Sequence, residues 1–111
     1  MSPFNQELYE RKAGLCKTFA DPKRLMIMEA LDEGERSVGE LAELIGVPHA
    51  VASRHLAVLR ERGVVTSRRE GTTVFYRLTD RRIAQACRLV QEVLMGLMER
   101  NRDLAEKIMR A

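Results

Sequence analysis

Several features that define whole classes of protein are missing from this 111-residue sequence. No apolar run approaches the roughly 18 residues needed to cross a bilayer, so we expect no membrane partner. The first residues lack the basic and apolar regions of a secretory signal, which makes the cytoplasm the expected location. Two cysteines, Cys16 and Cys87, are too few for a disulfide scaffold, and both are expected as reduced thiols in that compartment.

Signs of catalysis are missing as well. The sequence has no glycine-rich phosphate loop, no cluster of metal ligands and no nucleophile paired with a base. It also has no internal repeat, no low-complexity tract and no long linker. We therefore expect a single domain over residues 1–111 that is not an enzyme and holds neither a cofactor nor a metal.

What the sequence does have is an uneven distribution of charge. The net charge is only +3, but residues 48–82 hold eight arginines against three acids, and residues 29–47 hold six acids against one arginine. A basic stretch beside an acidic one indicates a one-sided electrostatic face, as in proteins that bind nucleic acids. The alternative is a solvated surface whose charge is simply uneven.

The pattern of apolar residues and caps predicts a mainly α fold with a small β-hairpin. Asp21 is typical of a helix N-cap, and Ser37 with Glu40 fits a capping box. Gly46 fits a left-handed helix end, and a turn at residues 70–73 separates two β-prone runs. The expected helices are residues 7–19, 22–32, 38–45, 48–62 and about 80–110, and the expected strands are residues 64–69 and 74–78.

Two short helices joined by a tight turn and followed by a hairpin predict a winged helix-turn-helix. It would have five helices, with a two-stranded wing between the fourth and the long last one. Leu41, Leu44 and Ile45 are expected to pack the first helix of the motif on the second. The remaining polar and basic face of the second helix is typical of one that enters the major groove of DNA. The DNA-contacting residues expected on it are His49, Ala50, Ser53, Arg54 and His55.

The hairpin gives the wing a basic tip. Arg68 and Arg69 precede the turn, Thr72 lies within it and Arg77 follows it. Such a tip reaches phosphates or the minor groove beside a recognition helix, so we expect these four residues to contact DNA. Arg54 is the expected base reader, because a guanidinium pairs bidentately with guanine. Winged helices also serve as protein-interaction modules, but the polar and basic face here favours DNA.

The last helix has a heptad pattern that predicts dimerisation. Its seam residues alternate spacings of four and three, as in a helix that packs on a partner helix. They are Ile83, Cys87, Val90, Leu94, Leu97, Asn101, Leu104 and Ile108. Asn101 is a polar residue within the seam and is expected to fix its register at some cost in stability. The alternative is that the stripe docks on its own domain.

Four segments in order resemble the ArsR/SmtB family of repressors, namely residues 20–25, 37–42, 53–65 and 67–78. They read ADPKRL, SVGELA, SRHLAVLRERGVV and SRREGTTVFYRL, and the resemblance covers about residues 15–80. It implies a homodimeric transcriptional repressor that leaves double-stranded DNA when an inducer binds. It also implies dimerisation helices at about residues 5–20 and 80–110, with Leu8 and Leu15 in the interface. Two-fold symmetry then requires a roughly palindromic operator.

The metal sites that the resemblance implies are not reproduced in this sequence. One kind lies within residues 37–41, where this chain has Val38 and Glu40 in place of cysteines. The other kind lies along the last helix, where Asp80 is present but other expected ligand positions hold residues that do not bind zinc. Those positions are Arg82, Val93 and Gly96. We therefore expect no zinc site of either kind.

The two cysteines are the candidate inducer site, since some relatives sense oxidants or reactive sulfur through a cysteine pair. A disulfide or polysulfide bridge between Cys16 and Cys87 would shift the first and last helices. Cations near the thiols, Lys12 or Lys17 for Cys16 and Arg88 for Cys87, are expected to lower their pKa values.

Other interpretations of the thiols stay open. In the sensing relatives the second cysteine usually lies in the second helix, near Met28 of this chain, and this sequence departs from that pattern. Free cysteines are often simply small buried apolar residues. Two thiols per chain would also suit a soft ion such as arsenite or Cu(I) across a dimer. An organic effector, or none, is a further alternative.

Overall fold

The computed structural model describes residues 2–111, apart from the side chain of residue 105. In chain order the elements are α1 (Gln6–Phe19), α2 (Pro22–Asp32), β1 (Arg36–Ser37), α3 (Val38–Ile45), α4 (His49–Glu61), β2 (Val65–Glu70), β3 (Thr73–Leu78), α5 (Arg82–Met98) and α6 (Arg102–Arg110). The chain divides into two compact units, Met1–Arg81 and Arg82–Ala111. No helix in the described part of the chain is long and apolar enough to cross a membrane.

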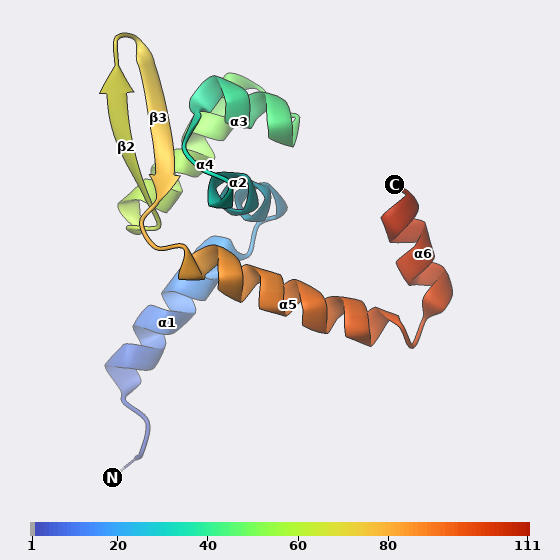
Figure 1. Ribbon diagram of the computed structural model, residues 1–111. Helices are drawn as coiled ribbons and strands as arrows, with labels where there is room; N and C mark the ends of the chain where they lie inside the picture. The colour runs from blue at the N-terminus through green and yellow to red at the C-terminus, as the bar shows by residue number, and fades with distance from the viewer. Residues whose placement is uncertain (1) are drawn as a thin grey trace. The chain divides into compact units, whose positions relative to one another are not determined.

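The first unit is a winged helix-turn-helix, as the sequence predicts. A short turn joins α3 to α4, and β2 pairs with β3 as an antiparallel hairpin. Figure 1 shows this hairpin projecting beyond α2, α3 and α4. The predicted bounds of these elements agree with the observed ones to within one or two residues, which is the usual uncertainty of helix and strand ends.

Side-chain caps fix where the first three helices begin. Asn5 caps α1 and Asp21 caps α2, each through a side-chain oxygen that accepts backbone amide hydrogens. Ser37 and Glu40 form the predicted capping box of α3. Each cap satisfies amides that have no partner within the helix, which typically stabilises a protein by about 1 kcal/mol.

The core of the first unit joins α2, α3 and α4 to the base of the hairpin. Its fully buried large side chains are Ile27, Met28, Leu41, Leu56, Leu59, Val64 and Val65. Burying one such side chain contributes about 1.5–3 kcal/mol, so the core fixes how α4 lies against α2 and α3.

Leu44 is the exception to the expected packing of α3 on α4. It is 57% exposed, so the prediction that it joins this contact is wrong. The buried face of α3 is formed by Val38, Leu41, Ala42 and Ile45, and the helical repeat places Leu44 outside that face.

The sheet has a third strand that the sequence pattern does not predict. β1 pairs antiparallel with β3, with Arg36 opposite Tyr76 and Ser37 opposite Phe75, so the strand order is β1-β3-β2. Two residues are too few to show the alternation that marks a strand. The pairing secures the wing to the segment between α2 and α3.

The second unit corrects the expectation of one long last helix. α5 ends at Met98, and Asn101 caps a separate helix, α6, by accepting from the amide of Leu104. An asparagine side chain competes with the helix backbone for hydrogen bonds, which makes it a better cap than a helix-interior residue. The heptad pattern therefore runs without interruption only from Ile83 to Leu97, and a place for Asn101 in a dimer interface stays a prediction.

Candidate nucleic-acid interface

The turn between α3 and α4 aims the expected recognition helix, and Gly46 makes this turn. Gly46 has a φ of 69°, in the left-handed region that favours glycine. Its amide donates to the carbonyls of Ala42 and Glu43, and the amide of Val47 donates to Ala42 at 3.0 Å. Only Val47 and Pro48 then separate Gly46 from the first residue of α4.

The start of α4 presents uncapped backbone amides. Its N-cap is Pro48, and no side chain caps this end. Side chains do cap α1, α2, α3 and α6. The first amides of a helix lack partners within the helix and carry partial positive charge, so they bind anions such as phosphate. His49 and Ala50, the first two residues of α4, are exposed, which leaves room for a ligand at these amides.

α4 has one face in the core and one in solvent. Ala52, Leu56 and Leu59 are fully buried. Arg54 lies on the opposite side of the helix and is exposed, whereas Ser53 is half-buried. Arg54 has no ion-pair partner among the residues that the structure describes. Its guanidinium is therefore available to a ligand.

His55 lies apart from the other expected DNA-contacting residues of α4. Its side chain is only 19% exposed, and Nε2 is 4.0 Å from the Oδ1 of Asp21, the cap of α2. The backbone amide of Arg24 is the main reason that the pKa of Asp21 lies below its usual value. This geometry directs His55 toward α2 and favours a packing role over contact with a ligand.

The wing ends in a two-residue turn formed by Gly71 and Thr72. Glu70 and Thr73 are the last paired residues of the hairpin. Of the two turn residues, only Gly71 has a positive φ, 62°, as at the first position of a type II′ turn. Thr72 and Arg69 are exposed near this tip, and Arg69 forms no ion pair within the described part of the chain.

Arg68 differs from Arg69 because two carboxylates hold it. Its guanidinium donates to both oxygens of Glu35, at 2.6 to 3.0 Å, and to Glu70 at 2.9 Å. It also lies 4.6 Å from the ring centroid of Phe75 on β3. The hydrogen bonds from Arg68 hold the pKa of Glu35 below its usual value. Nothing in the sequence pattern pairs Arg68 with Glu35, because only the fold brings these distant segments together.

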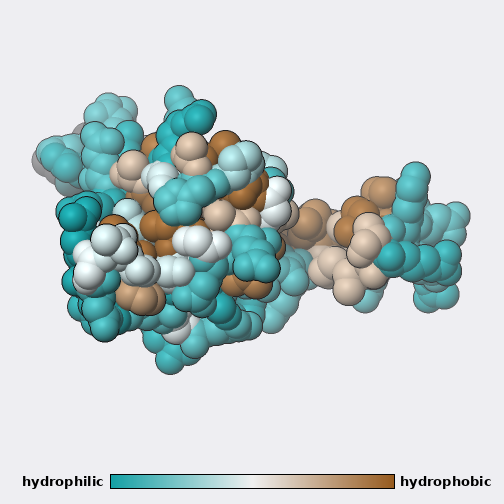
Figure 2. All heavy atoms as spheres, turned by 90° about the horizontal axis from the view of Figure 1, so that it is seen from above, coloured by the Kyte–Doolittle hydropathy of each residue, from teal (hydrophilic) through white to brown (hydrophobic). Residues whose placement is uncertain are grey.

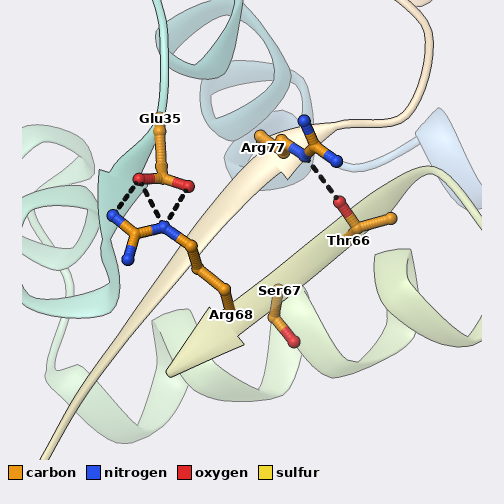
Figure 3. Close-up of a pocket in the computed structure, with 5 residues that line it drawn as sticks. All are labelled: Glu35, Thr66, Ser67, Arg68 and Arg77. Carbon is orange, nitrogen blue, oxygen red and sulfur yellow. Dashed lines mark hydrogen bonds and ion pairs between the residues drawn. The ribbon is translucent and has the colours of Figure 1, made fainter. Parts of the chain in front are cut away.

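Arg77 lies close to this cluster. Its Nε donates to the Oγ1 of Thr66, its cross-strand neighbour, at 3.2 Å. Figure 3 shows these two residues beside the Arg68–Glu35 pair. A hollow of about 380 Å³ lies here, and it is lined by Glu35, Thr66, Ser67, Arg68 and Arg77. Because Glu35 and Arg68 both line it, this side of the wing is not uniformly basic.

The two cysteines belong to different units. Cys16 is exposed on α1, and Cys87 is half-buried on α5. Burial raises the pKa of the Cys87 thiol, so the expectation that Arg88 lowers it is wrong. Within one chain Cys16 is not a core residue. Among the residues that the structure describes, no three His, Cys, Asp or Glu side chains gather as a metal site would require.

Apolar side chains stay exposed on the helices expected to dimerise. On α1, Leu8 is 58% exposed and Leu15 is also exposed. On α5, the seam residues Val90, Leu94 and Leu97 are exposed, while Ile83 and Cys87 are half-buried. Figure 2 shows hydrophobic atoms at the surface of the second unit. Contiguous exposed apolar surface typically marks a protein contact.

Comparisons with known proteins place this geometry in a family. The profile described as "Bacterial regulatory protein, arsR family" matches residues 21–67, which include α2, α3 and α4 and the start of the wing. An HTH-type transcriptional regulator from Methanocaldococcus jannaschii is 39% identical over 88 residues, which are 78% of this chain and 99% of that protein.

Two further relatives carry more specific names. The biofilm growth-associated repressor of Xylella fastidiosa is 49% identical over 73 residues, which are 66% of this chain and 64% of that repressor. This chain thus spans less than two thirds of the length of that protein. The solution structure of a homodimeric winged helix-turn-helix DNA-binding domain from Mycobacterium bovis matches with a TM-score of 0.74 and 33% identity. The match covers 89% of this chain and 95% of that domain.

Proposed function

This chain belongs to the ArsR family of winged helix-turn-helix regulators, and on that premise we propose that it is a homodimeric repressor of transcription. It binds double-stranded DNA in a sequence-specific manner and leaves its operator when an inducer acts. The observation that carries the proposal is the exposed face of α4. Uncapped amides and the small Ala50 lie at its start, and Arg54 follows one turn later with no ion pair among the described residues. Small and basic side chains at that end of a helix suit close approach to base edges.

The expected DNA-contacting residues of α4 have separate roles in this proposal. Arg54 pairs with a guanine in the major groove, His49 and Ser53 contact bases or phosphates, and Ala50 allows close approach. The first amides of α4 hold a phosphate. His55 supports α4 from the side of α2 rather than touching DNA, because its imidazole faces Asp21.

The wing adds sequence-independent affinity. Arg69 is the main phosphate contact, because its guanidinium is exposed and has no ion pair among the described residues. Thr72 lies next to it in the turn and contributes a hydrogen bond. Arg77 lies on the other face of the hairpin, beside Arg68, and contributes hydrogen bonds from there. Arg68 contributes less than its position in the sequence suggests, because Glu35 and Glu70 already neutralise its charge.

A two-fold symmetric homodimer matches an operator with two-fold symmetry. The exposed apolar residues of α1 and α5 become buried between two copies. The similar domain from M. bovis is described as homodimeric. Two α4 helices then enter successive major grooves about 34–36 Å apart, so the operator is roughly palindromic.

Thiol oxidation is the proposed release signal. The two thiols are those of Cys16 and Cys87, or one thiol from each of two copies of the chain. They lose two protons and two electrons to an oxidant such as diamide or a polysulfide and form a sulfur bridge. The exposure of Cys16 supports its part in this step, while the raised pKa of Cys87 slows its attack as a thiolate. A soft metal ion or an organic effector remains the alternative inducer.

Footprinting tests the proposal directly. The duplex is the DNA upstream of the gene that encodes this chain, and the protein is reduced with a monothiol. We expect protection of a roughly palindromic sequence, which an Arg60→Ala control retains because Arg60 lies at the far end of α4. Treatment with diamide should remove the protection, and a Cys16→Ser variant should resist it. Protection that persists in oxidised wild type would keep the repressor and discard the thiol signal.

A further inference from the structure

Lys23 joins the start of α2 to the end of α3. Its Nζ donates a hydrogen bond of 2.9 Å to the carbonyl of Ile45, the last residue of α3. The Lys23 side chain is half-buried, although most lysines keep their charge in water. Carbonyls at a helix end lack partners and carry partial negative charge, so an ammonium there both satisfies and attracts them. The carbonyl that Lys23 holds lies just before the turn into α4.

Asp21 reaches α4 from the same end of α2. Its Oδ1 accepts from the amides of Lys23 and Arg24 at 2.9 and 3.2 Å and also faces the Nε2 of His55 at 4.0 Å. His55 lies in the middle of α4, one turn beyond the exposed residues at its start. The start of α2 and its cap therefore face the recognition helix at His55 and hold the backbone just before that helix.

Arg24 extends these contacts to α1. Its Nε donates to the carbonyl of Thr18 at 2.7 Å, near the end of α1. Thr18 is buried and its hydroxyl donates to the carbonyl of Gly14. Residues 21–24 thus carry three side chains that bond to, or face, three different helices.

We propose that Lys23 and Asp21 are positioning residues for DNA recognition. Neither touches DNA; they set the position of α4 through Ile45 and His55. The inference rests on the proposed function and deepens it. Reading base edges requires side chains held to within about 0.5 Å, whereas phosphate contacts tolerate a shift of the helix. Loss of either residue therefore lowers affinity for the operator and not affinity for unrelated DNA.

The test compares two duplexes of equal length, the footprinted operator and a scrambled sequence, with the full-length protein. Lys23→Met removes the donor and keeps the length of the side chain, and Lys23→Arg keeps a donor. We expect Lys23→Met to weaken operator binding by up to about tenfold. That limit is reached if DNA binding must restore the whole of the position that this hydrogen bond holds. Binding to the scrambled duplex should change little, and Lys23→Arg should recover most of the operator affinity.

Asp21→Asn provides an independent variant. It removes a negative charge from the protein, whereas Lys23→Met removes a positive one. Asparagine caps a helix as well as aspartate does, so α2 keeps its cap, while the charge that faces His55 is lost. A more positive protein should bind both duplexes more tightly if charge alone mattered. The proposal instead predicts weaker binding to the operator only.

Four outcomes would overturn the proposal. The first is an equal loss on both duplexes, and the second is a Lys23→Arg variant as weak as Lys23→Met. The third is an Asp21→Asn variant that binds both duplexes more tightly than the wild type does. The fourth is a wild type that distinguishes the duplexes and variants that bind both as the wild type does. If the wild type itself does not distinguish the duplexes, the proposed function fails instead.

Discussion

The arginines of this interface differ in whether an ion pair within the protein already neutralises their charge. The guanidinium groups of Arg54 and Arg69 have no ion pair among the described residues, whereas Glu35 and Glu70 hold that of Arg68. A charge that is already paired gains less from a phosphate, because a new contact must replace an existing one. Ion-pair status thus ranks arginines that look equivalent along the chain.

Substitution of Arg54 tests base recognition. Arg54→Ala should lower affinity for the operator by about 1–3 kcal/mol and relax the sequence preference at one position of each half-site. Arg60→Ala is the matched control on the same helix. Competition binding against single-base variants of the operator measures both effects. A uniform loss over all sequences would make Arg54 a phosphate contact instead.

A comparison of Arg69→Ala with Arg68→Ala tests the wing. Both variants lose one positive charge, so any effect of net charge is the same. We expect Arg69→Ala to reduce the slope of log affinity against log salt by about one, the value for one lost phosphate contact. The slope for Arg68→Ala should match the wild type. A reversed order would show that phosphate displaces Glu35 from Arg68.

At the scale of elements, local signals in the sequence predict most of the fold. The capping box of α3 and the left-handed Gly46 were predictable because caps and turns depend on residues close in sequence. Asn101 carried a local signal too, but its place in the heptad pattern obscured its capping role. The pairing of Arg68 with Glu35 was not predictable, because contacts between distant segments leave no local pattern.

Gly46 allows a test of the turn that aims α4. Gly46→Ala forces a side chain into the left-handed region and should destabilise the fold by about 1–2 kcal/mol. Gly39→Ala in the same helix is the control, because that glycine lies inside α3 without a positive φ and an added Cβ meets only ordinary contact. It should stabilise the protein by up to about 1 kcal/mol. Urea unfolding measures both, and equal effects would contradict this role of Gly46.

At the scale of the whole molecule, the proposed dimer buries the exposed apolar residues of α1 and α5. Leu94→Asp should dissociate the dimer. Leu94 is 52% exposed in one chain, so two copies together lose about 1.5–3 kcal/mol of apolar burial, and two carboxylates would have to be buried in its place. Gln85→Asp adds the same charge on the opposite side of α5 and should leave the dimer intact. Light scattering at micromolar concentration distinguishes the two masses. A wild-type monomer, or a dimeric Leu94→Asp variant, would remove α5 from the interface.

The central claim is that this chain binds duplex DNA through α4 and the wing. Fluorescence anisotropy of a labelled operator duplex, titrated with reduced protein at several salt concentrations, tests it most directly. We predict tight binding whose logarithm falls linearly with the logarithm of salt concentration, because phosphate contacts release counterions. Absence of binding to duplex DNA, or binding that does not depend on salt, would contradict the account and favour a winged helix that binds protein.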